Sequence, residues 1–277
     1  MAAVVHLTPI EPKDEEYRIE MMRKAGRLSA EARALAGSMI RPGITTKEID
    51  TAIFKYIRAH GGYPNFYHLY GFKGSACMSI NDEIIHGVPS NRRLEEGDIV
   101  SVDVGACVGH YTLDKRGAPH GGFHGDCCAT FGVGQISEEA RRLIQVTEQS
   151  FWEGIKFAVA GNRISDIGRG VQTYVEQNGF SVVREFVGHG IGNEVHMAPE
   201  IPNYVLKRYP EGNPRLHKFQ TICVEPMVNA GSARIKFHTM PDGWEVIKTA
   251  DGKLAAHYEN TILITEGEPE ILTTCGD

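Results

Sequence analysis

Ile99-Val100-Ser101-Val102-Asp103-Val104-Gly105 places a valine at every second position, and Ser101, Asp103 and Gly105 fill the positions between. Alternation with a period of two is typical of a β-strand that packs one face and presents the other. The second face here holds a carboxylate between small side chains. Because an isolated ionised carboxylate inside a protein is costly, Asp103 is expected to have a partner or to bind a metal.

Two predicted helices precede this strand. Apolar residues recur at helical spacing over residues 15–39, where Asp14 is in position to cap the first turn. Thr45 and Glu48 fit a capping box for a second helix, which Gly61-Gly62 ends. Strand patterns follow at residues 76–80, 84–86, 98–104 and 123–133.

The second half of the chain repeats this order. Ser137 opens a predicted helix that runs to Val159, and Ser165 opens another that Gly179 ends. Strands are expected near residues 181–187, 220–228, 244–247 and 257–265, with a surface loop at 201–218. Two helices followed by antiparallel strands, twice over, predict an internally duplicated α+β domain. Because no low-complexity linker divides the chain, we expect a lead-in at residues 1–14 and one domain at 15–277, with halves at 15–134 and 135–277.

Composition narrows the class of protein. The 277 residues carry a net charge of −6 without a cluster of Lys and Arg, so the electrostatic footprint of a nucleic-acid binder is missing. No apolar run approaches the ~18–20 residues of a membrane span, and the first residues lack the pattern of a secretory signal. Six scattered cysteines without a CxxC pair predict neither a disulfide framework nor a cysteine zinc site. We therefore expect a cytoplasmic protein that binds neither nucleic acid nor membrane.

Three more acids stand within or beside apolar strand patterns. They are Asp126, Glu225 and Glu259, and together with Asp103 they have no Lys or Arg among them. Any one of the four fits a hydrogen-bonded structural residue, but the set lacks the cations that salt bridges need. His189 stands between Gly188 and Gly190 after a predicted strand, where small neighbours leave its imidazole open to a ligand.

Asp103, Asp126, His189, Glu225 and Glu259 make a candidate metal site of four carboxylates and one imidazole. This donor set suits Mn²⁺, Fe²⁺, Co²⁺ or Zn²⁺. Two divalent ions neutralise four carboxylates and one does not. Two ions roughly 3.5–4 Å apart share carboxylates and bind a bridging water, whose lowered pKa supplies hydroxide near neutral pH. The predicted chemistry is metal-assisted hydrolysis.

The order and context of these residues resemble those of the methionine aminopeptidases. The similarity covers residues 15–265, and its strings are Ser79-Ile80-Asn81, Ile85-His86-Gly87-Val88-Pro89, Gly97-Asp98-Ile99-Val100, Phe123-His124-Gly125-Asp126, Gly188-His189-Gly190-Ile191-Gly192, Glu225-Pro226-Met227-Val228 and Tyr258-Glu259-Asn260-Thr261. The resemblance implies the pita-bread (creatinase/aminopeptidase-like) fold, in which two pseudo-symmetric halves pack helices on a central curved antiparallel sheet.

The resemblance also implies how the metal ligands are shared. Asp126 and Glu259 would bridge the two ions, Asp103 would chelate one, and His189 and Glu225 would bind the other.

Three catalytic roles follow by the same resemblance. Glu225 would relay the proton of the attacking water, and His196 would contact the scissile amide or its carbonyl oxygen. His86 would contact the amide nitrogen beyond that bond and assist the leaving amine. These roles fit general acid–base and oxyanion chemistry at a metal centre. The alternative interpretation is that His86 and His196 are ordinary surface histidines without a catalytic role.

The implied substrate is the initiator methionine of nascent polypeptides, removed when the next residue is small. Phe72, Cys77 and Trp244 match positions of the methionine pocket, with Phe72 in place of a common tyrosine. Without the resemblance, Phe72 and Cys77 would be ordinary core residues, and Trp244 an aromatic beside a turn. Contact with the ribosome is a family-level expectation, and we expect a monomer.

The sequence departs from the family pattern in two places. Val195 precedes His196 where bacterial relatives often carry phenylalanine, and Asp103 and Asp126 are 23 positions apart, about twice the usual separation. The extra segment, residues 109–122, is expected to form a longer hairpin tip near the mouth of the site. Only 28 residues lie between His196 and Glu225, too few for the helical insertion of type II enzymes, so the compact type I form is implied.

Two other functions compete with this interpretation. Proline-specific aminopeptidases and prolidases share the five ligands, but they typically carry an extra N-terminal domain, whereas only 85 residues precede His86 here. A non-catalytic module that grips peptides on the same fold usually loses ligands, whereas all five remain here.

Overall fold

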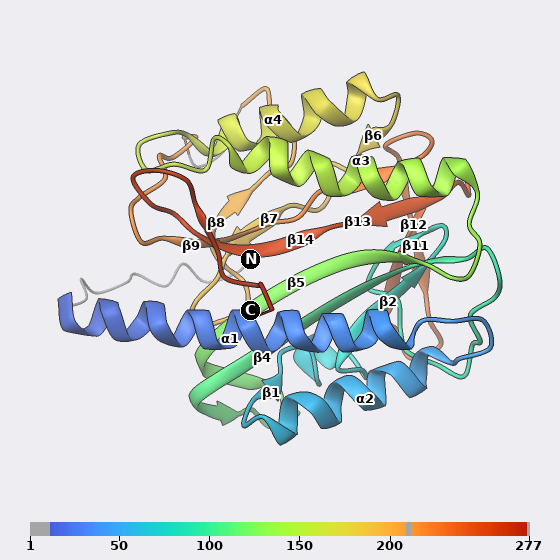
Figure 1. The fold of residues 1–277 in the computed structure, drawn as a ribbon, viewed down its shortest axis with the longest axis horizontal. Coiled ribbons are helices and arrows are strands. Elements are labelled where there is room, and N and C mark those ends of the chain that lie inside the picture. Colours follow the sequence, from blue (N-terminus) through green and yellow to red (C-terminus); the bar gives the residue numbers. More distant parts are fainter. Residues whose placement is uncertain (1–11, 209–211, 276–277) are drawn as a thin grey trace.

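Four α-helices flank a nine-stranded sheet in the computed structural model, which describes residues 12–208 and 212–275. The helices are α1 (Pro12–Met39), α2 (Thr46–Ala59), α3 (Glu138–Ile155) and α4 (Ile164–Gln177), and a 3₁₀ turn lies at Leu69–Gly71. In Figure 1, α3 and α4 lie above the strands and α1 and α2 lie below them. Each half of the chain therefore supplies one pair of helices, as the duplicated sequence pattern predicted.

The large sheet joins the two halves. Its strands run in the order β1, β4, β5, β14, β9, β7, β8, with β2 paired to β4 and β15 to β14. Their bounds are β1 (Tyr63–Pro64), β2 (Ala76–Ile80), β4 (Ile99–Leu113), β5 (Pro119–Gly132), β7 (Gly188–Gly190), β8 (Met197–Ile201), β9 (Thr221–Val224), β14 (Glu259–Leu263) and β15 (Glu270–Ile271). All these pairs are antiparallel, and β5 of the first half pairs directly with β14 of the second.

Two three-stranded sheets complete the described strands, in the orders β13-β10-β6 and β11-β12-β3. Their strands are β3 (Glu83–Ile85), β6 (Ser181–Val182), β10 (Met227–Asn229), β11 (Ile235–Thr239), β12 (Glu245–Thr249) and β13 (Ala255–His257).

Two of the N-caps predicted for the first three helices are present in the structure, and one is not. At α2 the capping box is confirmed, because Thr45 Oγ1 accepts the Glu48 N–H at 3.2 Å and the Glu48 carboxylate accepts the Thr45 N–H at 2.8 Å. Ser137 caps α3 as predicted, but α3 ends at Ile155, four residues before the expected Val159. The cap predicted at Asp14 is wrong, because α1 already begins at Pro12 and Asp14 lies in its first turn. Of the expected lead-in, residues 1–11 lie outside the described residues.

The start predicted for α4 is also wrong by two residues. Arg163 occupies the N-cap position, and its N–H donates to the Asp166 carboxylate at 2.9 Å. Ser165 lies inside the helix, where it is buried and its Oγ accepts from Asn213 Nδ2 at 2.9 Å. A tertiary hydrogen bond to the distant Asn213 therefore replaces the local cap that the sequence predicted.

The hairpin of β4 and β5 is longer than the strand patterns indicated. The strands were expected to end at Val104 and to begin at Phe123, but they pair as far as Leu113 and Pro119. The glycine-rich sequence between these points does not alternate between apolar and polar residues. Local propensity therefore did not predict these parts of the strands, which form because the two strands pair with each other. The extended hairpin predicted for residues 109–122 is confirmed.

Two predicted strands each divide into two. The strand expected at 220–228 ends at Val224 and resumes at Met227, and the strand expected at 257–265 divides at Tyr258. Pro226 cannot donate to a ladder, and after each break the chain changes sheets. The breaks leave Glu225 and Glu259 at strand ends. The strand expected at 181–187 reduces to β6.

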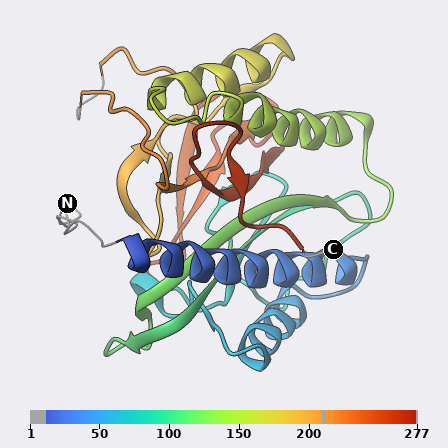
Figure 2. The ribbon, with the colours of Figure 1, turned by 60° about the vertical axis from the view of Figure 1, so that its left-hand side comes forward.

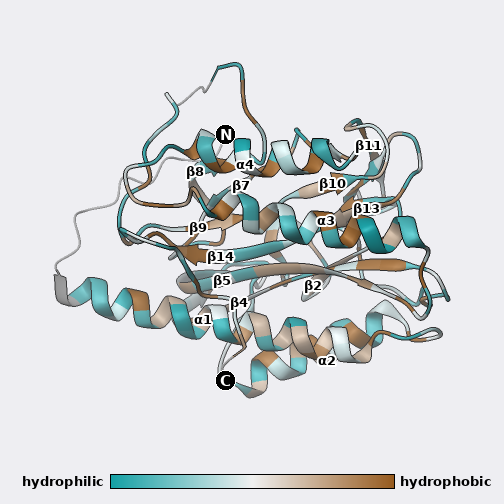
Figure 3. Cartoon of the chain, turned by 45° about the horizontal axis from the view of Figure 1, so that its top comes forward, coloured by the Kyte–Doolittle hydropathy of each residue, from teal (hydrophilic) through white to brown (hydrophobic). Residues whose placement is uncertain are grey.

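Separate apolar clusters fill the two halves. One packs α1 and α2 against β2, β4 and β5, and two others pack α3 and α4 against β9, β14, β10 and β13. Figure 3 shows brown, hydrophobic stretches along the central strands between the helix layers. In Figure 2 the segment after β15 runs beside α1, where Arg33 Nη2 donates to the Thr273 carbonyl at 3.4 Å. The core is thus built on both sides of the β5–β14 junction.

Candidate active site

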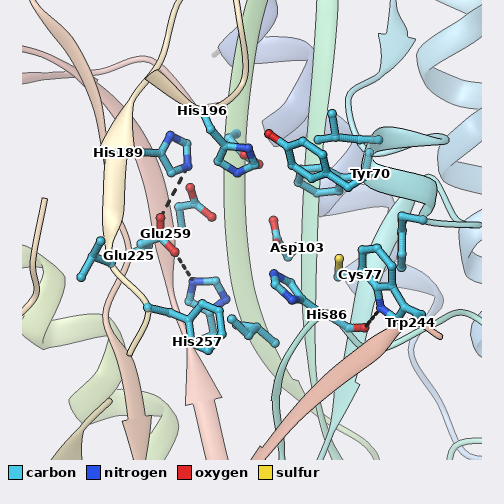
Figure 4. Close-up of a pocket in the computed structure, with 17 residues that line it drawn as sticks. Tyr70, Cys77, His86, Asp103, His189, His196, Glu225, Trp244, His257 and Glu259 are labelled. Carbon is cyan, nitrogen blue, oxygen red and sulfur yellow. Dashed lines mark hydrogen bonds and ion pairs between the residues drawn. The ribbon is translucent and has the colours of Figure 1, made fainter. Parts of the chain in front are cut away.

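Strand register places the predicted acids on one face of the large sheet. Asp103 in β4 lies opposite Cys128 in β5, and Cys128 lies opposite Glu259 in β14. Paired residues point to the same face, and so do residues two positions apart, which adds Asp126 to this group. Glu225 directly follows β9, the neighbour of β14. Figure 4 shows Asp103, Glu225 and Glu259 around one space.

No Lys or Arg of the described residues forms an ion pair with any of the four carboxylates. Within residues 12–208 and 212–275, the ion pairs found at these four acids are those of Glu225 with histidines. Asp126 and Glu259 are each only 2% exposed. One oxygen atom in each of Asp103, Asp126 and Glu259 has no hydrogen-bond partner, and ligand atoms of these three lie within 4.8 Å of one another. Buried acids so close together must hold protons or a cation.

The pKa values of the carboxyl groups reflect this crowding. Burial raises the pKa of Asp103 to about 7. Burial also raises the pKa values of Asp126, Glu225 and Glu259 well above the ordinary range, and the negative charges of the neighbouring acids add to the effect. A cluster of perturbed groups in a cavity is typical of a functional site.

His189 joins the cluster from β7. Its Nε2 lies 3.5 Å from Glu225 Oε1, and its Nδ1 lies 3.0 Å from the Gly190 carbonyl oxygen. The second contact orients the ring so that Nε2 faces the acids. The flanking glycines have a packing reason that the sequence did not reveal, since a Cβ on Gly188 would lie 2.3 Å from the Cys223 carbonyl oxygen.

Apolar side chains close one end of the cavity. Its volume is about 270 Å³, small beside the roughly 300–1,000 Å³ of pockets for drug-sized ligands. Phe72 and Cys77 are buried in its wall, and the Trp244 ring lies 5.0 Å from the Phe72 ring. Trp244 Nε1 donates to the His86 carbonyl oxygen at 2.9 Å, as Figure 4 shows. This end of the cavity suits one apolar side chain.

Two further histidines reach the cavity. His86 directly follows β3, and burial lowers its pKa to about 4, so the imidazole is neutral at pH 7. His196 directly precedes β8 at the exposed mouth. Its ring centroid lies 4.5 Å from that of His189 and 6.0 Å from that of Tyr70, on which it stacks.

All ten side chains predicted for the site line this one cavity. They are Phe72, Cys77, His86, Asp103, Asp126, His189, His196, Glu225, Trp244 and Glu259. The sequence did not single out His257, whose buried Nε2 has no hydrogen-bond partner and lies 3.8 Å from Glu225 Oε2. Because His257 stands two positions before Glu259, strand alternation could have found it. Tyr70 also lines the cavity, but its irregular loop carries no periodic signal.

Comparison with known proteins identifies the family. The model of metallopeptidase family M24 matches residues 20–266. The chain belongs to metallopeptidase family M24. Members of this metallopeptidase family use divalent metal, and the clusters of potential ligands described above fit such an ion.

Individual relatives in the M24 family match almost end to end. A methionine aminopeptidase from Clostridium perfringens is 50% identical over 258 residues, 93% of this chain and 96% of the relative. Methionine aminopeptidase 1 from Bacillus subtilis is 44% identical over 91% of this chain and 95% of the relative. The crystal structure of methionine aminopeptidase from Rickettsia prowazekii has a TM-score of 0.84 at 34% identity, covering 97% of this chain and 100% of that chain.

The structural likeness confirms the expected pita-bread α+β fold. It extends to the prolidase from Pyrococcus furiosus, with a TM-score of 0.72 at 21% identity over 95% of this chain and 65% of that chain, a likeness that concerns the fold alone. In the part of the chain that the structure describes, no helix combines the length and apolar character of a membrane span.

Proposed function

We propose that this M24 peptidase is a type I methionine aminopeptidase, which removes the initiator methionine from polypeptides whose second residue is small. The observation that carries the proposal is one cavity with an acidic, histidine-bearing end and an apolar end beside Trp244 and Cys77. The relatives named methionine aminopeptidase, at 44–50% identity over nearly the whole chain, support the same substrate.

The side chains of the acidic end fit two divalent cations. Three buried carboxylate oxygens lack any hydrogen-bond donor, which is the environment that a cation satisfies. Glu259 belongs to each of the three groups of ligand atoms that lie within 4.8 Å of one another, which supports it as a ligand shared between two ions. Asp103, Asp126, His189 and Glu225 would be the other side chains that hold the ions. Co²⁺, Mn²⁺, Fe²⁺ and Zn²⁺ all suit this set.

The chain's own groups then position the substrate. Divalent ions held by the acidic end would lower the pKa of a bound water toward neutrality. Glu225 would take up the proton released in the attack and pass it to the leaving amine. His196, at the mouth, hydrogen-bonds the carbonyl oxygen of the scissile amide, and neutral His86 hydrogen-bonds the leaving amine. Phe72, Cys77 and Trp244 hold the methionine side chain.

Further expectations about substrate, location and assembly belong to this proposal. The substrate class is the N-termini of nascent polypeptides, which implies work in the cytoplasm and encounters with the ribosome. We propose that one catalytic domain at residues 15–277 acts as a monomer.

A peptide assay tests the proposal. Purified protein supplied with each metal in turn should release methionine from Met-Ala-Ser and leave Ala-Pro-Ala intact. Asp103→Asn should abolish turnover and lower the number of bound ions, because one ligand loses its charge, whereas Asp14→Asn, on the exposed start of α1, should change neither. Cleavage of Ala-Pro-Ala would point to a prolidase. A folded, metal-loaded protein that cleaves neither peptide would point to a binding module.

A further inference from the structure

The tip of the β4–β5 hairpin, residues 109–122, contacts two segments that lead to the cavity mouth. The Asp114 carboxylate closes its turn by accepting the N–H groups of Arg116 at 2.8 Å and Ala118 at 2.9 Å. The ladder shifts register between Val108 and Tyr111, and Gly109, Gly121 and Gly122 all have positive φ. A bulge of this kind bends a hairpin away from its sheet.

One side of the tip rests on the loop that leads to Tyr70. Tyr63 Oη donates to the Gly117 carbonyl oxygen at 3.1 Å, and the Tyr63 and Tyr111 rings lie 5.6 Å apart. Gly117 itself packs against the His68 ring, since a Cβ added there would lie 3.1 Å from it. The loop continues from His68 to Tyr70 at the cavity mouth.

The other side of the hairpin binds the segment that leads to His196. Glu194 Oε2 lies 3.1 Å from His120 Nδ1, and Glu194 Oε1 accepts the Gly121 N–H at 3.3 Å. Two further hydrogen bonds join the same stretches, from Asn193 Nδ2 to the Gly122 carbonyl and from the His124 N–H to the Gly192 carbonyl, both at 3.0 Å. An isolated exposed ion pair stabilises little, but four links fix the path of residues 192–194.

We propose that Glu194 and His120 are positioning residues for the reaction. Through their contact, the hairpin tip acts as a support, here called the strut, that holds His196 in place. Glu194 lies two residues before His196, and the intervening Val195 is buried in one cluster with Phe72 and Cys77 of the cavity wall. The strut therefore contacts both loops whose side chains, Tyr70 and His196, stack across the mouth. The inference rests on the proposed function, because it assigns His196 to the scissile carbonyl.

Glu194→Ala tests the proposal. It should lower kcat for Met-Ala-Ser about 3- to 10-fold with little change in KM, because a contact made in the transition state is misplaced. Glu194→Gln, which keeps an oxygen for the Gly121 N–H, should recover part of this loss. Glu139→Ala, at an exposed position in the first turn of α3, is the matched control and should leave kcat unchanged.

A mutant cycle with His196 separates positioning from general damage. If Glu194 acts through His196, then Glu194→Ala should cause no further loss of kcat in a His196→Ala background. Additive losses, or an unchanged kcat in Glu194→Ala, would overturn the inference while leaving the proposed function standing.

The side-chain NMR resonances of His196 provide a readout that does not depend on turnover. Glu194→Ala and His120→Ala should both shift these resonances, and Glu139→Ala should not. If the wild-type protein cleaves no methionyl peptide, the proposed function fails, and this measurement still decides whether the hairpin positions His196. Unshifted resonances in both variants would overturn the inference.

Discussion

His86 shows how single residues hold the candidate site in shape. Its φ of +64° lies in the left-handed region, which non-glycine residues seldom adopt. The conformation is held by its neighbours, because its carbonyl oxygen accepts from Trp244 Nε1. In addition, a Cβ on the following Gly87 would lie 2.1 Å from the Met78 carbonyl oxygen. Backbone strain of this kind persists only where surrounding contacts over-determine it, often at functional sites.

His86→Ala should lower kcat about 10²- to 10⁴-fold, the usual contribution of a positioned acid or base. The variant should keep both metal ions, because His86 is not among the proposed ligands. Metal analysis beside peptide kinetics checks both halves of this prediction. His238→Ala, at an exposed position of β11, is the control. Loss of metal from His86→Ala would contradict the assigned role.

At the scale of elements, the position of Asp126 depends on how closely α1 packs on β5. Gly125 makes this approach possible, because a Cβ there would lie 2.6 Å from the backbone of Ala25 and Gly26 in α1. The Gly125 carbonyl also accepts from Ser29 Oγ at 3.0 Å. Helix α1 therefore packs directly on β5 at Gly125, the residue next to the proposed metal ligand Asp126.

Gly125→Ala should destabilise the protein by about 1–3 kcal/mol, the usual cost of overpacking a close contact. For a domain of this size, each kcal/mol lowers Tm by roughly 2–4 °C, which calorimetry resolves. Gly267→Ala is the matched control, because a Cβ at Gly267 meets nothing within 4 Å. Equal Tm values for the two variants would show that α1 moves aside without cost.

At the scale of the whole molecule, the two halves meet where the acids gather. Cys128 and Glu259 pair across the β5–β14 junction, so the buried charge of the site lies in the contact between the halves. Without a cation, this charge opposes folding. Burial raises the pKa of Asp103 to about 7, so the metal-free native protein keeps this proton while the unfolded chain releases it near about pH 4. The stability that Asp103 contributes is therefore full below about pH 4 and is lost as the pH rises through about 7.

A bound divalent cation removes this loss by replacing the proton. We predict that Mn²⁺ raises Tm, relative to a chelator, more at about pH 8 than at about pH 5, because protons and metal compete for the same ligands. Thermal unfolding at a series of pH values measures this difference. In Asp103→Asn the Tm increase caused by Mn²⁺ should depend less on pH, since the side chain at position 103 no longer titrates. If Mn²⁺ raised the Tm of the wild-type protein equally at every pH, the cation would bind elsewhere.

The sequence determined the fold class, the capping box at Thr45 and Glu48, and ten of the residues that line the cavity. Strand alternation and donor chemistry indicated the five proposed metal ligands, since alternation marks which face an acid occupies. The other five residues, Phe72, Cys77, His86, His196 and Trp244, were implied by the resemblance to the methionine aminopeptidases. Only the tertiary structure decided where β9 and β14 begin and end, that Ser165 bonds Asn213 instead of capping α4, and that His257 and Tyr70 join the site. It alone brought Glu194 to the hairpin tip. Such contacts join residues far apart along the chain, and their energies depend on packing that no local pattern records.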